Sequence, residues 1–161
     1  MTSLQYIEPS FYQKDHARLL AGIRKTHEME KAPSEIPVQW RQFIQFKSEL
    51  HDVAADSDGV SYGVICAGDA TGFEYMCAAE VNSFQYVPTD SRLKLQDQKY
   101  AVFVHSGNIS EIKSVWQGVW QWVESSGYEL AEAPCFEKYD QRFDAQTGTG
   151  GFEIWIPVTA F

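Results

Sequence analysis

Residues 133–158 read APCFEKYDQRFDAQTGTGGFEIWIPV and contain two short apolar, aromatic stretches on either side of a turn-rich segment. Both stretches are rich in the aromatic and β-branched residues that favour β-strands. Each nevertheless carries one glutamate, Glu137 in the first and Glu153 in the second. The sequence therefore places a carboxylate within each of two segments that we expect to be partly buried.

Side chains alternate between the two faces of a strand, and this alternation assigns each glutamate to a face. Glu137 shares a face with Tyr139, and Glu153 shares a face with Trp155. The opposite face of the second strand consists of Phe152, Ile154 and Ile156. We expect that apolar face to pack against a helix, while the glutamate faces point elsewhere. They point either to solvent, as glutamates usually do, or into a cleft where a carboxylate beside aromatic rings attracts a cation.

The first half of the chain predicts a strand, a helix and a hairpin. The strand lies in the second half of residues 10–24, and a turn-rich loop covers residues 51–59. A helix capped by Ser34 runs to about Leu50. Its apolar face consists of Ile36, Trp40, Phe43 and Ile44. Two further strands, residues 60–68 and 73–81, form the hairpin.

The second half predicts the same elements after a polar linker, residues 82–92. A strand lies in residues 94–107. The helix that follows is capped by Asn108, has Glu111 in the position of a capping box, and is closed by Gly127. Its apolar face consists of Ile112, Val115, Trp116, Val119 and Val123. The two strands of residues 133–158 come last.

The two halves therefore repeat one order of elements. The pair Ile36 and Trp40 recurs 76 residues later as Ile112 and Trp116. We predict an α+β fold made of duplicated βαββ units, about residues 10–81 and 93–158, related by a pseudo-twofold axis. The antiparallel sheet would carry two main helices, and a cleft along the axis would be a natural ligand site.

The length of the chain, its net charge and its N-terminal segment exclude several classes of protein. The 161 residues suit a single domain. The net charge of −9 argues against direct binding to nucleic acid or to anionic membranes, and it is compatible with a cationic ligand. The N-terminal segment lacks a signal-peptide core, and no stretch has the length of a membrane span. We expect a soluble, cytoplasmic protein.

Cofactor and catalytic motifs are weak throughout. Cys66, Cys77 and Cys135 are widely spaced, and the four histidines lack metal-ligand spacing, so we predict no metal and no cofactor. The calcium-loop pattern near DSDG, residues 56–59, fails at its first and last ligand positions. The stretch QTGTGG, residues 146–151, lacks the lysine of a phosphate loop and reads as a hairpin turn. Glu137 and Glu153 would suit a glycosidase only if they faced each other.

Several segments together resemble the GyrI-like small-molecule-binding domain, which is also the effector-binding domain of AraC-type and MerR-type multidrug regulators. The segments are YGV at 62–64, FEYMCAAEV at 73–81, KYAVFVHSG at 99–107, IxxxWxxVW at 112–120, FEKYD at 136–140 and EIWIPV at 153–158. Their order and spacing span residues 10–158. The resemblance implies the duplicated fold just described, in a form without a DNA-binding domain.

The resemblance also implies a function, namely binding of amphipathic cationic or aromatic compounds in the cleft between the halves. Glu137 matches the carboxylate that the family often places in its pocket. The ligand-binding residues that we predict are Glu137, Tyr139, Trp116, Trp120, Tyr75, Glu153 and Trp155. Tyr62 and Tyr100 are further candidates for the walls, and Trp116 and Trp40 can serve either the core or the ligand.

Two other functions remain open at this point. A relative with the same fold inhibits DNA gyrase, so this acidic chain could instead bind a protein partner such as gyrase or a regulator. Some relatives are implied to be hydrolases, so a weak activity on reactive small molecules is the third alternative. We expect a binding protein and not an enzyme.

Overall fold

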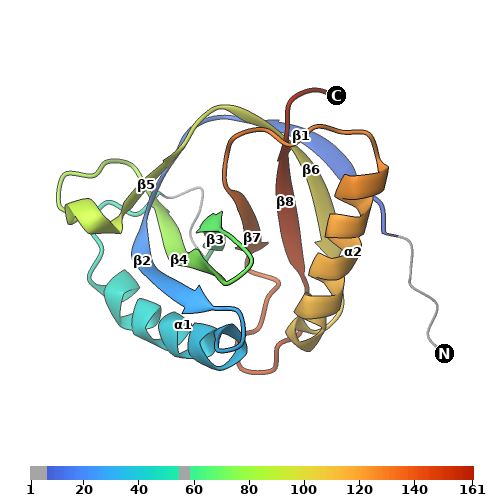
Figure 1. The fold of residues 1–161 in the computed structure, drawn as a ribbon. Helices are drawn as coiled ribbons and strands as arrows, with labels where there is room; N and C mark the ends of the chain where they lie inside the picture. Colours follow the sequence, from blue (N-terminus) through green and yellow to red (C-terminus); the bar gives the residue numbers. More distant parts are fainter. Residues whose placement is uncertain (1–6, 55–58) are drawn as a thin grey trace.

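The computed structural model describes residues 7–54 and 59–161, and within them it forms one eight-stranded antiparallel sheet and two α-helices. The sheet curls strongly, and α1 and α2 lie outside the curl (Figure 1). The elements of the first half are β1 (Phe11–Asp15), β2 (Arg18–Glu28), α1 (Ala32–Ser48), β3 (Ser61–Gly68) and β4 (Gly72–Val81). Those of the second half are the short 3₁₀ turn η2 (Thr89–Ser91), β5 (Arg92–Leu95), β6 (Gln98–His105), the 3₁₀ turn η3 (Ile109–Glu111), α2 (Ile112–Ser125), β7 (Cys135–Tyr139) and β8 (Phe152–Val158). Residues 55–58, which include most of the predicted loop motif DSDG, lie outside the described residues.

The sheet confirms the predicted duplication. Its strand order, β1-β6-β8-β7-β3-β4-β2-β5, places each strand of one half in the position that its counterpart holds in the other half. β7 and β3 form the central pair, and the counterparts outward from them are β8 and β4, β6 and β2, and β1 and β5. The fold is therefore α+β with pseudo-twofold symmetry about the β3–β7 pair.

The strand predicted at the start of each half is interrupted and forms two strands. This corrects the predicted order of strand, helix, strand, strand. One break lies at residues 16–17, between β1 and β2, and the other at residues 96–97, between β5 and β6. The short strands are exchanged between halves, since β1 pairs with β6 and β5 pairs with β2. The two breaks meet, because the backbone N–H of Ala17 donates to Oδ1 of Asp97 over 2.7 Å.

Helix α1 differs from its prediction at two points. It begins at Ala32, after Lys31, and the predicted cap Ser34 instead donates its hydroxyl to the carbonyl of Lys31 over 3.0 Å. Ile44 does not belong to the buried face, since its side chain is 68% exposed, and Gln39 is fully buried instead. Five residues turn a helix by about 140° beyond one full turn, so Ile44 cannot share the face that Gln39 occupies.

Helix α2 and its neighbours follow their predictions. The N–H of Asn108 donates to Oε1 of Glu111 over 3.0 Å, which completes the capping box at η3. Gly127 follows the helix with a φ of 79°, as expected for a glycine at a helix end. The buried face of α2 packs against the apolar face of β8, that is Phe152, Ile154 and Ile156, as expected.

The two faces of the sheet have separate cores. The inner core, enclosed by the curl, consists of Leu20, Val60, Tyr62, Val64, Met76, Ala78, Leu95, Tyr100, Val102, Phe136 and Trp155. On the outer face, α1 covers β2 and β4, and α2 covers β6 and β8. The central strands β3 and β7 therefore lie beneath the space between the two helices.

Candidate ligand-binding cage

Glu137 lies on β7 at the centre of the sheet, with its side chain on the outer face. Its direct partner on β8 is Ile154, which packs beneath α2, so Glu137 shares the helix-packed side of the sheet. We expected both glutamate faces to point away from that side, and for Glu137 this was wrong. The side chain is only 5% exposed, which makes it a buried carboxylate and not a surface glutamate.

Three neutral donors hold the carboxylate of Glu137. The hydroxyls of Tyr75 and Tyr139 donate to its Oε1 over 2.6 and 2.8 Å. The indole N–H of Trp116 donates to its Oε2 over 2.9 Å. Four of the predicted binding residues are thus brought together from β4, β7 and α2.

Two repeat-related tryptophans form the walls above this carboxylate. The ring of Trp40, from α1, lies edge-on to the ring of Tyr139, with 5.6 Å between centroids, and to that of Tyr75, with 6.3 Å. From α2, Trp116 stacks on the partly exposed Trp120 over 5.7 Å. We call Glu137, Tyr75, Tyr139, Trp40 and Trp116 the aromatic cage.

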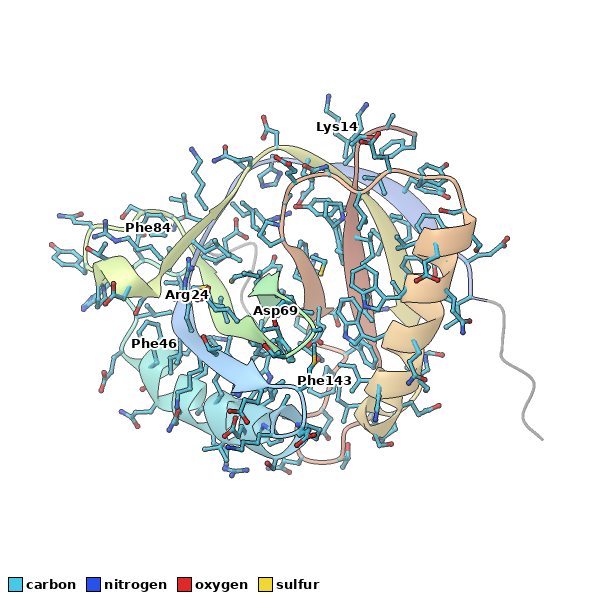
Figure 2. The ribbon with its side chains drawn as sticks, viewed as in Figure 1. Lys14, Arg24, Phe46, Asp69, Phe84 and Phe143 are labelled. Atoms are coloured by element: carbon cyan, nitrogen blue, oxygen red, sulfur yellow. The ribbon has the colours of Figure 1, made fainter. Side chains whose placement is uncertain are left out.

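Phe143 extends the cage, and the sequence pattern did not point to it. It follows β7 in the loop to β8, and its ring lies 4.8 Å from that of Tyr139. Figure 2 shows it in the space between α1 and α2. The only sequence signal was its place three residues beyond the FEKYD segment, within a connection that reads as a turn.

Gly63 provides the room that the polar floor of the cage requires. It pairs directly with Glu137 across β3 and β7. A Cβ at this position would lie 2.0 Å from the hydroxyl oxygen of Tyr75 and 2.7 Å from Oε1 of Glu137. Only glycine therefore allows the tyrosine hydroxyl to reach the carboxylate past β3.

A buried polar network fixes α1, and with it Trp40, to the sheet. The amide nitrogen of Gln39 donates to the backbone carbonyls of Ile23 and Tyr75 over 2.9 and 2.8 Å. Its oxygen lies 2.6 Å from Nε2 of the buried His27. The residue before Trp116 in α2 is the buried Val115, so the second half uses an apolar contact at the corresponding position.

The electrostatics of the cage are those of a carboxylate without a counter-ion. Burial raises the pKa of Glu137, and the three hydrogen bonds oppose that rise by favouring the charged form. Burial, together with the negative charge of Glu137, also raises the pKa of Tyr75 and Tyr139 well above the ordinary value for tyrosine. Among the described residues, no lysine, arginine or histidine forms an ion pair with Glu137.

Glu153 and Trp155 do not join the cage. Trp155 pairs with Phe136 across β7 and β8 and belongs to the inner core, on the other face of the sheet. Its indole N–H donates to Oε1 of Glu153 over 2.9 Å, and Arg142 holds the other oxygen. Because the two glutamates lie on opposite faces, they cannot act as the paired carboxylates of a glycosidase. Tyr62 and Tyr100 are also in the inner core and cannot be walls of the cage.

The floor of the cage is buried, since Glu137, Tyr75 and Tyr139 are at most 8% exposed. Two cavities lie elsewhere, one of about 320 Å³ beside Gly118 and Trp122 and one of about 510 Å³ beside Tyr62 and Glu80. None of the five cage residues lines either cavity. In addition, no helix in the described part of the chain is both long enough and apolar enough to cross a bilayer.

Comparison with known proteins agrees with this architecture. The chain matches the family model Cass2, described as integron-associated effector binding protein, over residues 13–158. It is 34% identical over 124 residues to the transcriptional regulator BrlR of Pseudomonas aeruginosa, a match that covers 74% of this chain and 44% of that regulator. The chain thus spans less than half the length of this curated relative.

Two solved structures share the fold over nearly the whole chain. The structure of SAV2435 bound to tetraphenylphosphonium superposes with a TM-score of 0.76 at 22% identity and covers 93% of each chain. The integron cassette protein VCH_CASS2 of Vibrio cholerae superposes with a TM-score of 0.65 at 20% identity and covers 95% of this chain and 97% of that one. The family match confirms the resemblance seen in the sequence: the chain belongs to the Cass2 family of effector-binding proteins.

Proposed function

We propose that this protein binds amphipathic aromatic cations in the aromatic cage, with Glu137 as the counter-charge. The observation that carries the proposal is a carboxylate that is only 5% exposed and has three neutral donors but no cationic partner among the described residues. A buried charge without a counter-ion is costly. A ligand that supplies the missing positive charge would repay part of that cost.

The rings around Glu137 suit the same kind of ligand. Trp40, Trp116 and Tyr139 are aromatic, and a cation over such a ring gains about 0.5–2 kcal/mol, depending on how far it is desolvated. The low local dielectric strengthens both this attraction and the attraction of the carboxylate. Aromatic groups on the ligand would replace the contacts that the tryptophans now make with each other and with the tyrosines.

Relatives provide further support. SAV2435, which shares the fold, has been solved with tetraphenylphosphonium, a lipophilic cation. The relative BrlR is a transcriptional regulator, and the family model describes effector binding. A ligand-binding role thus agrees with the family.

Because the carboxylate of Glu137 is buried, binding requires the walls of the cage to move. Trp116 must give up its hydrogen bond to Glu137, or Trp40 must withdraw from Tyr139, before a ligand reaches the carboxylate. We therefore expect slow association compared with an open cleft and a clear change in tryptophan fluorescence on binding.

The test is isothermal titration with two ions of the same shape and opposite charge, tetraphenylphosphonium and tetraphenylborate. We expect micromolar binding of the cation, about −8 kcal/mol, and none of the anion. Glu137→Gln should abolish binding of the cation. Glu153→Gln is the matched control, because it removes the same charge from the opposite face, and it should bind as the wild type does. A folded wild-type protein that binds neither ion, or both equally, would overturn the proposal.

A further inference from the structure

Glu35 and Glu111 are repeat-related glutamates, 76 residues apart, at the starts of the two helical segments. Each lies beside a histidine from the strand that precedes its helix. Oε1 of Glu35 lies 3.1 Å from Nδ1 of His27, near the end of β2. Oε1 of Glu111 lies 3.6 Å from Nε2 of His105, the last residue of β6. Both helices that carry a cage tryptophan thus begin at a contact between a histidine and a carboxylate.

The hydrogen bonds of Gln39 fix the position of one proton on His27. The amide nitrogen of Gln39 donates to the carbonyls of Ile23 and Tyr75. Its oxygen is therefore the atom that lies 2.6 Å from Nε2 of His27, and this nitrogen must carry a proton, because an amide oxygen only accepts. A neutral ring has a single N–H, so its Nδ1 would then direct a lone pair at the carboxylate of Glu35. Only the imidazolium, with a second proton on Nδ1, can donate to Glu35.

His105 makes a similar contact in the second half of the chain. Its Nε2 is buried and has no hydrogen-bond partner among the residues that the structure describes. Gly107 leaves space for the approach, since a Cβ there would lie 2.8 Å from this nitrogen and 2.5 Å from Oε1 of Glu111. A positive charge on the ring would be attracted to that carboxylate, whereas a neutral ring gains little from it.

The other groups that face the two rings are uncharged. His27 is faced by the amide of Gln39 from α1 and by the ring of Phe73 from β4. His105 is faced by the ring of Phe152 from β8. Within the described ranges, no further carboxylate forms an ion pair with either ring. Histidine changes its charge between about pH 5 and pH 8, so these two contacts respond to pH in that range.

We propose that His27 and His105 are proton-dependent latches. Their imidazolium forms hold the starts of α1 and α2 to the sheet through Glu35 and Glu111, and their neutral forms release them. The stabilisation is present at acidic pH and is lost as the histidines deprotonate. In each helix the cage tryptophan follows the glutamate by five residues, so release makes the walls of the cage easier to move. Only this last step rests on the proposed function.

The first test uses Glu35→Gln in the ligand-free protein. A glutamine accepts from the imidazolium through its oxygen and donates to the neutral ring through its nitrogen, so the variant holds α1 in both forms. Chemical denaturation is compared at about pH 5.5 and about pH 8.5, on either side of the range in which histidine titrates. On going to the higher pH, the wild type should lose stability relative to the variant by on the order of tenfold in the unfolding equilibrium constant.

Glu49→Gln is the matched control, because it removes the same charge from the other end of α1. Its difference from the wild type should not change with pH. Titration of Glu137 cancels in these comparisons, since all three proteins retain it. A pH-independent difference for Glu35→Gln would overturn the inference. The imidazole ¹⁵N resonances of His27 give a direct readout: the neutral ring should be the Nε2–H tautomer, and an Nδ1–H tautomer would contradict the latch.

The second test asks whether the latches control the cage. Glu35→Gln combined with Glu111→Gln keeps both helix starts held at alkaline pH, and glutamine suits a capping box as glutamate does. By stopped-flow tryptophan fluorescence at about pH 8.5, this double variant should associate with tetraphenylphosphonium several-fold more slowly than the wild type. Glu49→Gln combined with Glu124→Gln removes two charges from the opposite helix ends and should associate as the wild type does.

The two tests fail in different ways. Equal association rates for the wild type and the double variant at alkaline pH would overturn the link between the latches and the cage. If the proposed function fails instead, tetraphenylphosphonium does not bind to the wild type at any pH, while the stability difference produced by Glu35→Gln still changes with pH.

Discussion

Gly63 and Glu137 face each other across the central strand pair, so the missing side chain of one makes room for the buried carboxylate of the other. The nearest atom to a Cβ at position 63 would be the hydroxyl oxygen of Tyr75, at 2.0 Å. The glycine in YGV is thus part of the cage, although it contributes no atom that could contact a ligand.

Gly63→Ala should destabilise the protein by about 1–3 kcal/mol, because the methyl group overpacks a site with rigid neighbours. Chemical denaturation measures this loss. Adding Tyr75→Phe should recover part of it, since that change removes the atom closest to the methyl group. Ser61→Ala, two residues away on the same face of β3, should have little effect; a comparable loss there would mean that β3 is simply intolerant of substitution.

Glu137→Gln should stabilise the ligand-free protein at pH 7–8 by on the order of 1 kcal/mol. The folded-state pKa of Glu137 is raised, so its proton is held more tightly in the folded than in the unfolded chain. Stability from this group is then present at low pH and is lost as the pH rises through the folded-state pKa. The amide avoids this loss, because it does not ionise and so has no charged form to desolvate. Thermal unfolding at several pH values would show a difference between wild type and variant that grows with pH, and a constant difference would contradict the explanation.

Binding of tetraphenylphosphonium should weaken on acidification through the pKa of Glu137. The cation prefers the charged carboxylate, and burial raises the pKa of that carboxylate above the ordinary value for glutamate. Affinity should therefore be highest at neutral to alkaline pH and fall about tenfold for each unit of pH well below the folded-state pKa. Titrations in buffers of different ionisation enthalpy would also detect proton release on binding near that pKa. A pH-independent affinity in a folded protein would mean that Glu137 is not the counter-charge.

Gln39→Ala should cost about 2–4 kcal/mol, because it takes a hydrogen-bond partner from the buried His27 and from the backbone carbonyls of Ile23 and Tyr75. It should also weaken cation binding, since Trp40 follows Gln39 in α1 and depends on the same docking. Gln45→Ala, at an exposed position of the helix, is the control for lost helix contacts. An unchanged unfolding midpoint in Gln39→Ala would show that the network contributes nothing to the position of α1.

The sequence predicted the fold and the central part of the cage for identifiable reasons. Alternation alone placed Glu137 beside Tyr139, and the repeated spacing placed Trp40 and Trp116 on equivalent helices. The grouping of Glu153 and Trp155 with them failed for a physical reason. Alternation tells which residues of one strand share a face, but the pairing of Phe136 with Trp155 decides which faces of two strands coincide.

Other features depended on tertiary contacts that leave no local pattern. Gln39 is a polar residue on the buried face of α1. Its burial is possible because it forms hydrogen bonds with His27 in β2 and with backbone carbonyls in β2 and β4. The breaks near Ala17 and Asp97 interrupt stretches that are continuous in composition. Phe143 belongs to a connection whose composition indicates only a turn.

The exchange of β1 and β5 has a consequence for how the chain can be assembled. Residues 11–15 pair with residues 98–102, and residues 18–21 pair with residues 92–95, so each half completes its sheet only with a strand from the other. Pairings this distant along the chain make folding slow relative to a protein of similar size with local contacts. A chain cut between the halves should yield two fragments that are unstable alone. Only on mixing should they regain the fold, and with it the cage, which lies where the two halves meet.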